Sequence, residues 1–399
     1  MAAQTDGNRR SARKQGDPWL ELTQCAPGTP MGTLLRQFWQ PVAYTAELEP
    51  GTAMTIRALG EDLTFYRGQS GEPHLVANRC AHRGTFLAAG WVEGECIRCF
   101  YHGWKYDGTG QCVEMPAEDA SFARKVTIAA YPVYDYHGLL FAYLGPGGPP
   151  PFPRRIEIEQ AGVVWAQSTR QVWPSNWLQQ VENSLDATHV SFVHRGGQFG
   201  EAITRDIPQL EYEETEFGII QRATRAGGNV RESDFQFPNA NHIILPVPGD
   251  DSLPWYDLFV WKVPIDETHT GMFSISSSPI GGEAGEQIKE KISFRQGYNA
   301  YDYHEDIMHK RMPADMGNLV QAQDYLAQVG QGAIADRSAE RLGQSDAGVI
   351  LLRRIMRREL DLIKKGRATK QWRMRSSVAG LPVPPTAAKG TAPLTMAGV

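Results

Sequence analysis

The sequence predicts an α+β fold in which an N-terminal all-β domain precedes a larger domain of antiparallel sheet and helices. Short alternating or β-branched runs, separated by Gly, Asp and Pro turns, occupy residues 42–145. The segment GPGGPPPFPRR at 145–155 is too rich in Pro and Gly for a helix or an interior strand, so we expect a domain boundary there. Helical and strand-like segments alternate after it.

The chain is expected to divide into five parts. Residues 1–16 are polar and basic and predict a disordered lead. Residues 17–41 form an N-terminal helical segment, in which a short helix begins at Pro30 and is ended by Pro41. The remaining parts are the all-β domain at 42–150, the second domain at 151–380 and a flexible tail at 381–399.

Strands and helices follow the hydrophobic pattern within these parts. The all-β domain has strand-like runs in MTIRALGEDLTFYRG, HLVANRC, CIRCFY and VTIAAYPVYDYHGLLFAYLG. In the second domain, SNWLQQVENSLDATHVSFVH at 175–194 predicts a helix, and strand-like pieces follow between about 205 and 295. Helical patterns return from about 298 to 365, where Ser345 is the expected N-cap of the last helix and Gly366 its stop.

Composition excludes several classes of protein. The 399 residues carry a net charge of −5 and a pI near 6.1, which argues against nucleic-acid binding. No apolar run approaches the roughly 20 residues that span a bilayer, and no apolar stretch typical of an export signal follows the basic N-terminus. The five cysteines are an odd number, which fits a reducing compartment where clustered Cys and His more often bind metal than form disulfides. We therefore expect a cytoplasmic protein.

Two short loops in the all-β domain combine cysteine with histidine. Cys80 and His82 lie in the first loop and Cys99 and His102 in the second, with the spacing C-x-H-x16-C-x-x-H. Two thiolates and two imidazoles can hold either Zn²⁺ or an iron–sulfur cluster. Zinc fingers usually supply both cysteines and then both histidines, whereas here each loop offers one of each. A [2Fe–2S] cluster with two Cys on one iron and two His on the other requires that pairing.

These loops resemble those of the Rieske family, which read C-x-H-R-G and C-x-x-H-G-W. This chain has CAHRG from Cys80 and CFYHGW from Cys99. The resemblance implies a Rieske [2Fe–2S] cluster with a potential of roughly −150 to +300 mV, in which the glycine after each His gives the backbone room to approach the cluster. The alternative interpretations are a zinc site, or core residues that bind no metal. Cys96 lacks a following His and is interpreted as a small buried strand residue.

A second group of acids and histidines lies in the segment predicted to be helical. On a helix, Glu182, Asp186 and His189 would stand at i, i+4 and i+7 on one face. His194 comes five residues after His189, about 140° off that face, so both can bind one ion only if the helix bends or ends there. Acids and a His near a core are costly unless a metal or partner neutralises them. A solvated helix end is the alternative interpretation of this spacing.

The same segment resembles the catalytic segment of Rieske oxygenases, D-x-x-H-x4-H, which Asp186, His189 and His194 match. In that family the two His and a carboxylate hold a mononuclear non-haem Fe(II), with positions left open for O₂. The Asp is understood to hydrogen-bond the first His and to bridge toward the Rieske His of a neighbouring subunit. The resemblance therefore implies that Asp186 orients His189 and lies on the path of the electron.

The third ligand is expected to be a carboxylate further along the chain. A rival pair, His304 and His309, has the same spacing but Tyr301 where an Asp should stand, so we interpret it as an exposed polar helix. We choose Asp324, because it shares a helix face with apolar residues and because its Q-D pair resembles the ligand of the phthalate and phenoxybenzoate dioxygenase branch. The carboxylates weighed against it are Asp315, Asp336, Glu340 and Asp346.

Together the resemblances imply the oxygenase component of a multicomponent Rieske non-haem iron system. The expected reaction inserts O₂-derived oxygen into an aromatic acid or diaryl ether by ring dihydroxylation or hydroxylation. Electrons would come from an NAD(P)H-dependent flavin and iron–sulfur reductase, and the family implies a homotrimer or a multiple of it. A monooxygenase or demethylase of the same fold is the nearest alternative. A Rieske electron carrier without oxygenase activity and a zinc-stabilised binding protein are more distant ones.

An anionic substrate would need a cation in its pocket. The aromatic run WYDLFVWKV at 255–263 is interpreted as strand core that could also line such a pocket. The candidate cations are Arg195, Arg222, Arg225 and Arg231.

Overall fold

The computed structural model of the chain describes most residues between Trp19 and Arg373. The predicted lead and tail lie outside the described residues, as do Arg195, Tyr301 and Asp315. The described ranges are 19–166, 170–194, 206–226, 228, 230–247, 250, 252–293, 304–309, 311 and 319–373.

The N-terminal segment is helical only in its first part. Helices α1 (Leu20–Thr23) and α2 (Pro30–Leu35) lead into strand β1 (Trp39–Tyr44). Pro41 therefore lies inside a strand, and the expectation that it ends a helix is wrong. Because β1 is an edge strand whose register shifts just after Pro41, the missing N–H of this proline is tolerated there.

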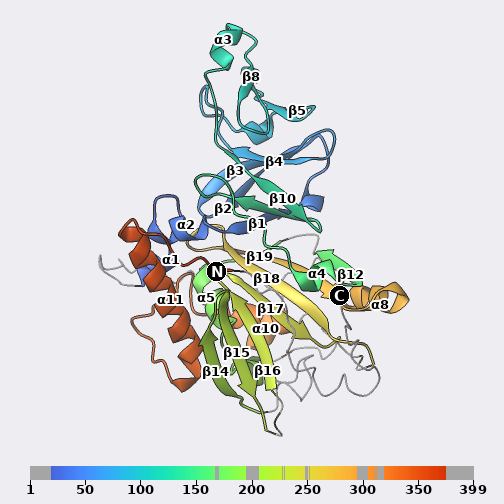
Figure 1. The fold of residues 1–399 in the computed structure, drawn as a ribbon, viewed down its shortest axis with the longest axis vertical. Helices are drawn as coiled ribbons and strands as arrows, with labels where there is room; N and C mark the ends of the chain where they lie inside the picture. The colour runs from blue at the N-terminus through green and yellow to red at the C-terminus, as the bar shows by residue number, and fades with distance from the viewer. Residues whose placement is uncertain are drawn as a thin grey trace, which may run out of the picture.

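The all-β domain predicted from the sequence is confirmed and is built from three small antiparallel sheets within the described residues (Figure 1). One has the order β1, β11 (Leu139–Tyr143) and β10 (Val133–Tyr136). The second has the order β2 (Ala53–Ala58), β3 (Glu61–Arg67), β4 (Pro73–Ala77) and β9 (Ala130–Tyr131). The third, at the tip of the molecule, has the order β5 (Trp91–Glu93), β6 (Cys96–Arg98), β7 (Lys105–Tyr106) and β8 (Cys112–Glu114). The short helical turns are η1 (Thr45–Glu47), η2 (Leu87–Ala89) and α3 (Ala120–Ala123).

A large antiparallel sheet forms the frame of the second domain, as predicted. Its order is β12 (Val163–Ala166), β19 (Thr270–Ser278), β18 (Tyr256–Pro264), β17 (Ala240–Leu245), β16 (Val230–Gln236), β15 (Gly218–Thr224) and β14 (Gln209–Glu214), and β13 (Gln171–Trp173) also pairs with β19. The helices described around it are α4 (Ile156–Glu159), α5 (Trp177–Asn183), α6 (Val190–Val193), α8 (Gly282–Ser293), α9 (His304–Met308), α10 (Leu319–Val329) and α11 (Ala347–Lys364), with the turn η4 (Gln344–Asp346).

One hydrophobic core joins the N-terminal segment, the sheet of β1 and the large sheet. Tyr44 and Phe141 from the first sheet and Phe259 from β18 belong to the same buried cluster, together with Trp177 of α5 and Leu352 of α11. Helix α11 packs on both α2 and β14, and Figure 1 shows it along one side of the molecule. The tip of the all-β domain has a separate small core around Tyr106.

The predicted helix over 175–194 is interrupted. Helix α5 ends at Asn183 and α6 begins only at Val190. Between them, the Asp186 carboxylate accepts hydrogen bonds from the N–H groups of Thr188 and His189, at 2.9 and 3.2 Å. A short acidic side chain that bonds to nearby backbone competes with the helical hydrogen bonds, which explains the break.

Three further expectations on helices have mixed outcomes. Helix α8 lies inside the region expected to be strand-like, with Ile288 and Ile292 buried on one face. The helical region after 298 is not continuous, because the described residues 330–343 are not helical. Asp346, not Ser345, directly precedes α11, while Gly366 follows its end with a φ of 64°, as predicted.

No helix among the described residues combines the length and the apolar character that crossing a bilayer needs.

Candidate metal centres

The two Cys–His loops fold in the same way. In the first, the Cys80 N–H donates to the Thr85 carbonyl and the Gly84 N–H to the Cys80 carbonyl, both over 2.9 Å. The second loop repeats the pattern around Cys99, with distances of 2.8 and 3.0 Å. Gly84 and Gly103 have φ values of 72° and 75°, a region that glycine enters without strain, so each loop needs its glycine to turn back after the histidine.

The loops bring the four predicted side chains together at the tip of the all-β domain. Cys80 and Cys99 are buried, whereas His82 and His102 are exposed, and the two imidazole centroids lie 4.4 Å apart. Burial raises the pKa of the Cys99 thiol, so binding of a metal would displace a proton there. Two buried sulfurs beside two outward imidazoles are the donor set that a [2Fe–2S] centre of unequal irons takes.

Tyr106 is a neighbour of this group that the sequence analysis missed. Its hydroxyl accepts a hydrogen bond from the Ala81 N–H at 3.2 Å and lies 3.3 Å from the Cys80 sulfur. The hydroxyl proton is therefore available to the sulfur, and such bonds raise the potential of iron–sulfur centres. Cys96 lies in β6, partly exposed rather than buried as interpreted.

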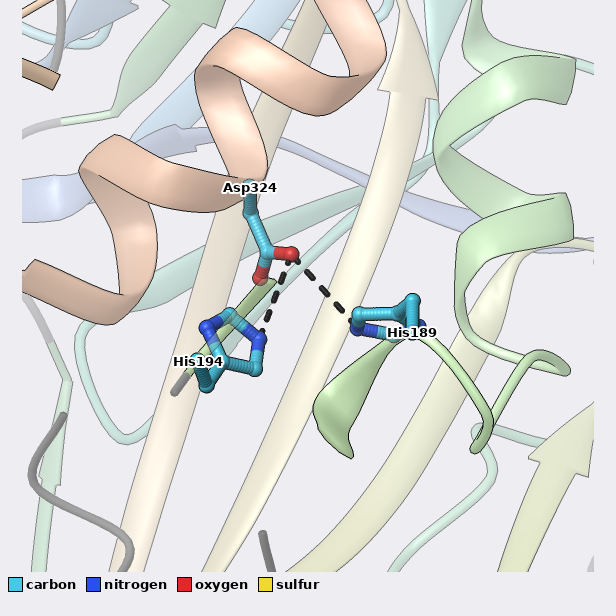
Figure 2. A group of neighbouring side chains, drawn as sticks. All are labelled: His189, His194 and Asp324. Atoms are coloured by element: carbon cyan, nitrogen blue, oxygen red, sulfur yellow. Dashed lines mark ion pairs between the residues drawn. The ribbon is translucent and has the colours of Figure 1, made fainter. Parts of the chain in front are cut away.

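A second constellation lies between α6, α10 and the large sheet. Within the described residues, His189, His194 and Asp324 form a group whose possible ligand atoms all lie within 4.8 Å of one another. The Nε2 atoms of the two imidazoles are 3.6 and 3.5 Å from the Asp324 Oδ1, and Figure 2 shows both rings turned toward that carboxylate. Two imidazoles and one carboxylate converging on a point are the donor set of a 2-His-1-carboxylate iron site.

A polar side chain lies behind each of the two imidazoles. Gln323 places its side-chain oxygen 3.0 Å from Nδ1 of His194. If this oxygen accepts the Nδ1 proton, the lone pair of His194 is left on Nε2, toward Asp324. Asp186 lies behind His189, with 3.7 Å between Oδ2 and Nδ1, beyond direct hydrogen-bond distance.

The charges at this constellation suit a cation. Burial lowers the pKa of His189 and favours the neutral imidazole, which is the ligating form. Burial alone would raise the pKa of Asp324, but the two imidazoles and Lys262 lower it overall, so the carboxylate is ionised. Asp324 Oδ1 is buried without a hydrogen-bond donor, as expected of an oxygen that faces a metal position.

Glu182 is not part of this constellation, which corrects the expectation of a shared helical face. Its carboxylate pairs with the buried guanidinium groups of Arg337 and Arg353, at 2.9 and 2.6 Å. The helical face that was expected to carry Glu182, Asp186 and His189 does not form, because α5 ends before Asp186.

The rival ligand candidates make other contacts. Asp336 accepts a hydrogen bond from Ser338, and Glu340 pairs with Arg353. Asp346 accepts a bond from the Gly343 N–H. His309, after the short α9, has a side chain that is 57% exposed and pairs with Glu305, as expected of a polar helix.

The chain matches the family model of the Rieske [2Fe–2S] domain over residues 38–132. It is 32% identical to the 5,5'-dehydrodivanillate O-demethylase oxygenase subunit of Sphingobium sp. (strain NBRC 103272 / SYK-6) over 88% of this chain and 81% of that protein. It is 33% identical to the phenoxybenzoate dioxygenase subunit alpha of Ectopseudomonas oleovorans, over 88% and 87%. The chain belongs to the Rieske oxygenases.

A solved structure shares the fold of this oxygenase subunit. NdmA of Pseudomonas putida CBB5 superposes with a TM-score of 0.62 at 21% identity, over 83% of this chain and 92% of that one. The 33% identity to the phenoxybenzoate dioxygenase subunit confirms the resemblance to that branch and the activity class, an oxygenase subunit of a Rieske system. The chain accordingly carries a Rieske [2Fe–2S] domain.

A cavity of about 200 Å³ adjoins the His–His–Asp group of this oxygenase. Leu258, Val260 and Lys262 of β18 line it, while the alternate residues Phe259 and Trp261 pack into the core. The aromatic residues of the run 255–263 are thus mainly strand core, and the residues that alternate with them face the cavity.

The arginines proposed as substrate cations differ in position. Arg231 lines the cavity. Arg222 is 37% exposed and pairs with Glu213 and Glu232. Arg225 is buried but does not line the cavity. Lys262 was missed because an isolated lysine inside an aromatic strand carries no motif.

Proposed function

We propose that this oxygenase subunit inserts O₂-derived oxygen into an aromatic substrate, with His189, His194 and Asp324 holding the mononuclear iron. The convergence of these three side chains beside a cavity carries the proposal. A bound Fe(II) would supply the activation of O₂. Cys80, His82, Cys99 and His102 are the proposed ligands of the Rieske cluster.

The surrounding residues then have distinct tasks. Gln323 fixes the orientation of the His194 imidazole, and Asp186 holds the backbone turn that carries His189. The largely apolar cavity wall holds the ring and excludes water. The protein places the substrate and controls the arrival of electrons, while the oxidising chemistry belongs to the metal.

We further propose that electrons pass between neighbouring chains of a homotrimer. His82 and His102 are exposed at the tip of the all-β domain, and the other two small sheets lie between this tip and the large sheet (Figure 1). A head-to-tail ring can bring the tip of one chain to Asp186 of the next. The proposed donor is an NAD(P)H-dependent flavin and iron–sulfur reductase. The proposed domain division is the one expected from the sequence, with its boundary near residue 150.

Oxidative O-demethylation is the second candidate reaction. It is favoured because the relative from Sphingobium, as similar as the dioxygenase subunit, is an O-demethylase. Product analysis separates the two reactions, since a methoxy-substituted substrate releases formaldehyde only in the second.

Replacement of Asp324 by Ala tests the iron assignment. Loss of the only carboxylate in the group should remove the mononuclear iron and reduce substrate-dependent O₂ uptake by at least about 100-fold. The visible spectrum of the Rieske cluster should stay unchanged, because the cluster loops lie in a separate small core.

The matched control is Asp361→Ala on α11, where a carboxylate that is 62% exposed pairs with Lys364. This variant should keep both iron content and O₂ uptake. An Asp324→Ala protein that retains its iron and its turnover would discard the assignment.

A further inference from the structure

Lys262 is a buried cation on the cavity wall without a carboxylate partner. It lies in the middle of β18, is 8% exposed and lines the cavity. Its ammonium group donates a hydrogen bond to the Ser184 hydroxyl. Within the described part of the chain, no carboxylate oxygen lies within ion-pair distance of it; the attraction of Asp324 reaches it only from further away.

A buried ammonium of this kind is costly without a counter-ion. Burial lowers the pKa of Lys262 to about 8, in spite of the attraction of Asp324, so the group is still largely protonated at neutral pH. An ammonium has three N–H donors, and one of them is used by Ser184. An anion bound in the cavity would accept the others and supply the missing charge.

The other cations on the wall cannot take this role beside the metal position. His242 is held between Asp234 and Asp257, at 3.1 and 2.7 Å, and is already neutralised. Arg231 of β16 lies far from Lys262 of β18 along the sheet. The strand register places Phe235 level with Val260, and Arg231 comes before Phe235 while Lys262 comes after Val260. Arg231 and Lys262 are therefore six positions apart along the strands, roughly 20 Å at the rise of a strand.

The wall between these two cations is formed largely by apolar residues, Ile243, Leu258 and Val260, with the polar Ser233 and Asn241 beside them. Met272 is the direct cross-strand neighbour of Lys262. The cavity of about 200 Å³ lies below the 300–1,000 Å³ of pockets for drug-sized ligands, so it suits a single substituted ring. A largely apolar slot with one cation at the end near the metal position favours an aromatic ring with one acidic group.

We propose that Lys262, supported by Ser184, binds the carboxylate of an aromatic monocarboxylic acid and so holds its ring against the apolar wall beside His189, His194 and Asp324. This specificity role rests on the proposed function, because it concerns the substrate of the same site. Lys262 is a binding residue here, and it takes no part in the proposed oxygen chemistry.

Paired acids and amides test the proposal by binding alone. Benzoate, 4-hydroxybenzoate and 4-methoxybenzoate, each with its own primary amide, are titrated calorimetrically into the iron-loaded enzyme. The wild-type protein should bind at least one acid about 10-fold more tightly than its amide. Lys262→Met should weaken binding of that acid by about 30- to 100-fold and leave the amide within about 3-fold. Lys262→Arg should retain the preference for the acid.

Arg231→Met is the matched control, because it removes the other cation of the wall and should preserve the preference for the acid. The proposal is overturned if no acid outcompetes its amide in the wild type, or if Lys262→Met weakens acid and amide alike. It is equally overturned if Arg231→Met, instead of Lys262→Met, abolishes the preference.

Turnover separates this proposal from the proposed function. Acid binding that depends on Lys262, without O₂ uptake for any compound, would refute the oxygenase role of the site and support the anion site. O₂ uptake that depends on Asp324 but is unchanged in Lys262→Met would support the oxygenase role of the site and refute the anion site.

Discussion

His194 is fixed from behind by Gln323, whose side-chain oxygen lies 3.0 Å from Nδ1. The two residues come from segments far apart in the chain, α10 and the end of α6, and the same α10 carries Asp324. In the proposed iron site, the adjacent Gln323 and Asp324 thus act together, Gln323 by orienting the ligand His194 and Asp324 as a ligand itself. Replacing Gln323 by a residue without a side-chain oxygen would remove this contact of the His194 imidazole but leave the three possible ligand side chains in place.

Glu182 illustrates the cost of a buried charge. It lies between Arg337 and Arg353, which are 5% and 3% exposed, so its loss would leave two buried guanidinium groups without their shared partner. Glu182→Ala should therefore lower the free energy of unfolding by about 3–5 kcal/mol, measured by denaturant titration.

The control is Glu21→Ala, which breaks the exposed pair with Lys364 and should cost less than about 1 kcal/mol. Equal effects of Glu182→Ala and Glu21→Ala would contradict the buried-pair argument.

His242 predicts a pH dependence of stability. Burial alone would lower its pKa, but hydrogen bonds to Asp234 and Asp257 raise it to about 9. Because the unfolded pKa is about 6.5, the stabilisation is complete below that pH and is lost as pH rises through about 9. The free energy of unfolding should fall by up to about 3 kcal/mol across this window, relative to His242→Gln. Denaturant titrations from pH 6 to about 10 measure it, and identical slopes for both proteins would exclude it.

The break between α5 and α6 separates His189 and His194 from the helical face of Glu182. Both histidines flank the single helical turn of α6, one at each end. The turn at Asp186 precedes this helical turn, and both Nε2 atoms approach Asp324 from its two ends. The resemblance of the sequence to a family predicts the residues that converge here. Helical periodicity wrongly predicts one continuous face for Glu182 and His189, because it ignores the hydrogen bonds by which the Asp186 side chain ends the helix.

Asp186→Asn separates the turn from the charge. The amide oxygen still accepts the two backbone N–H groups, so His189 should keep its position and the protein its iron. Removal of the charge behind His189 should reduce turnover about 10- to 100-fold. Single-turnover kinetics with a reduced cluster and an iron assay measure both effects. Turnover close to the wild-type rate would show that the charge of Asp186 is unimportant.

Other elements show why sequence patterns predict some of this fold. The strands of the all-β domain follow the alternation of apolar residues and were predictable, as was the stop at Gly366. Helix α8 was missed although Ile288 and Ile292 share one face, because its many charged residues obscure a short apolar stripe. Lys262 could not be predicted, because its burial depends on the pairing of β18 with β17 and β19.

The continuous hydrophobic core connects the proposed iron site to the part of the molecule that carries the cluster domain. Trp177 of α5 and Phe259 of β18 share that core with Phe141 of the all-β domain. The large sheet and α11 therefore hold the second site rigidly against the N-terminal domain, whereas the cluster loops occupy a small core of their own at the exposed tip.

A Rieske cluster and a mononuclear iron in one chain can be counted. Iron and acid-labile sulfide per chain, determined on protein purified without oxygen, give this count. We expect about three irons and two sulfides per chain, and about two of each in Asp324→Ala. Zinc in place of iron at Cys80 and Cys99, or equal iron and sulfide in the wild-type protein after iron loading, would show that the chain does not hold both centres.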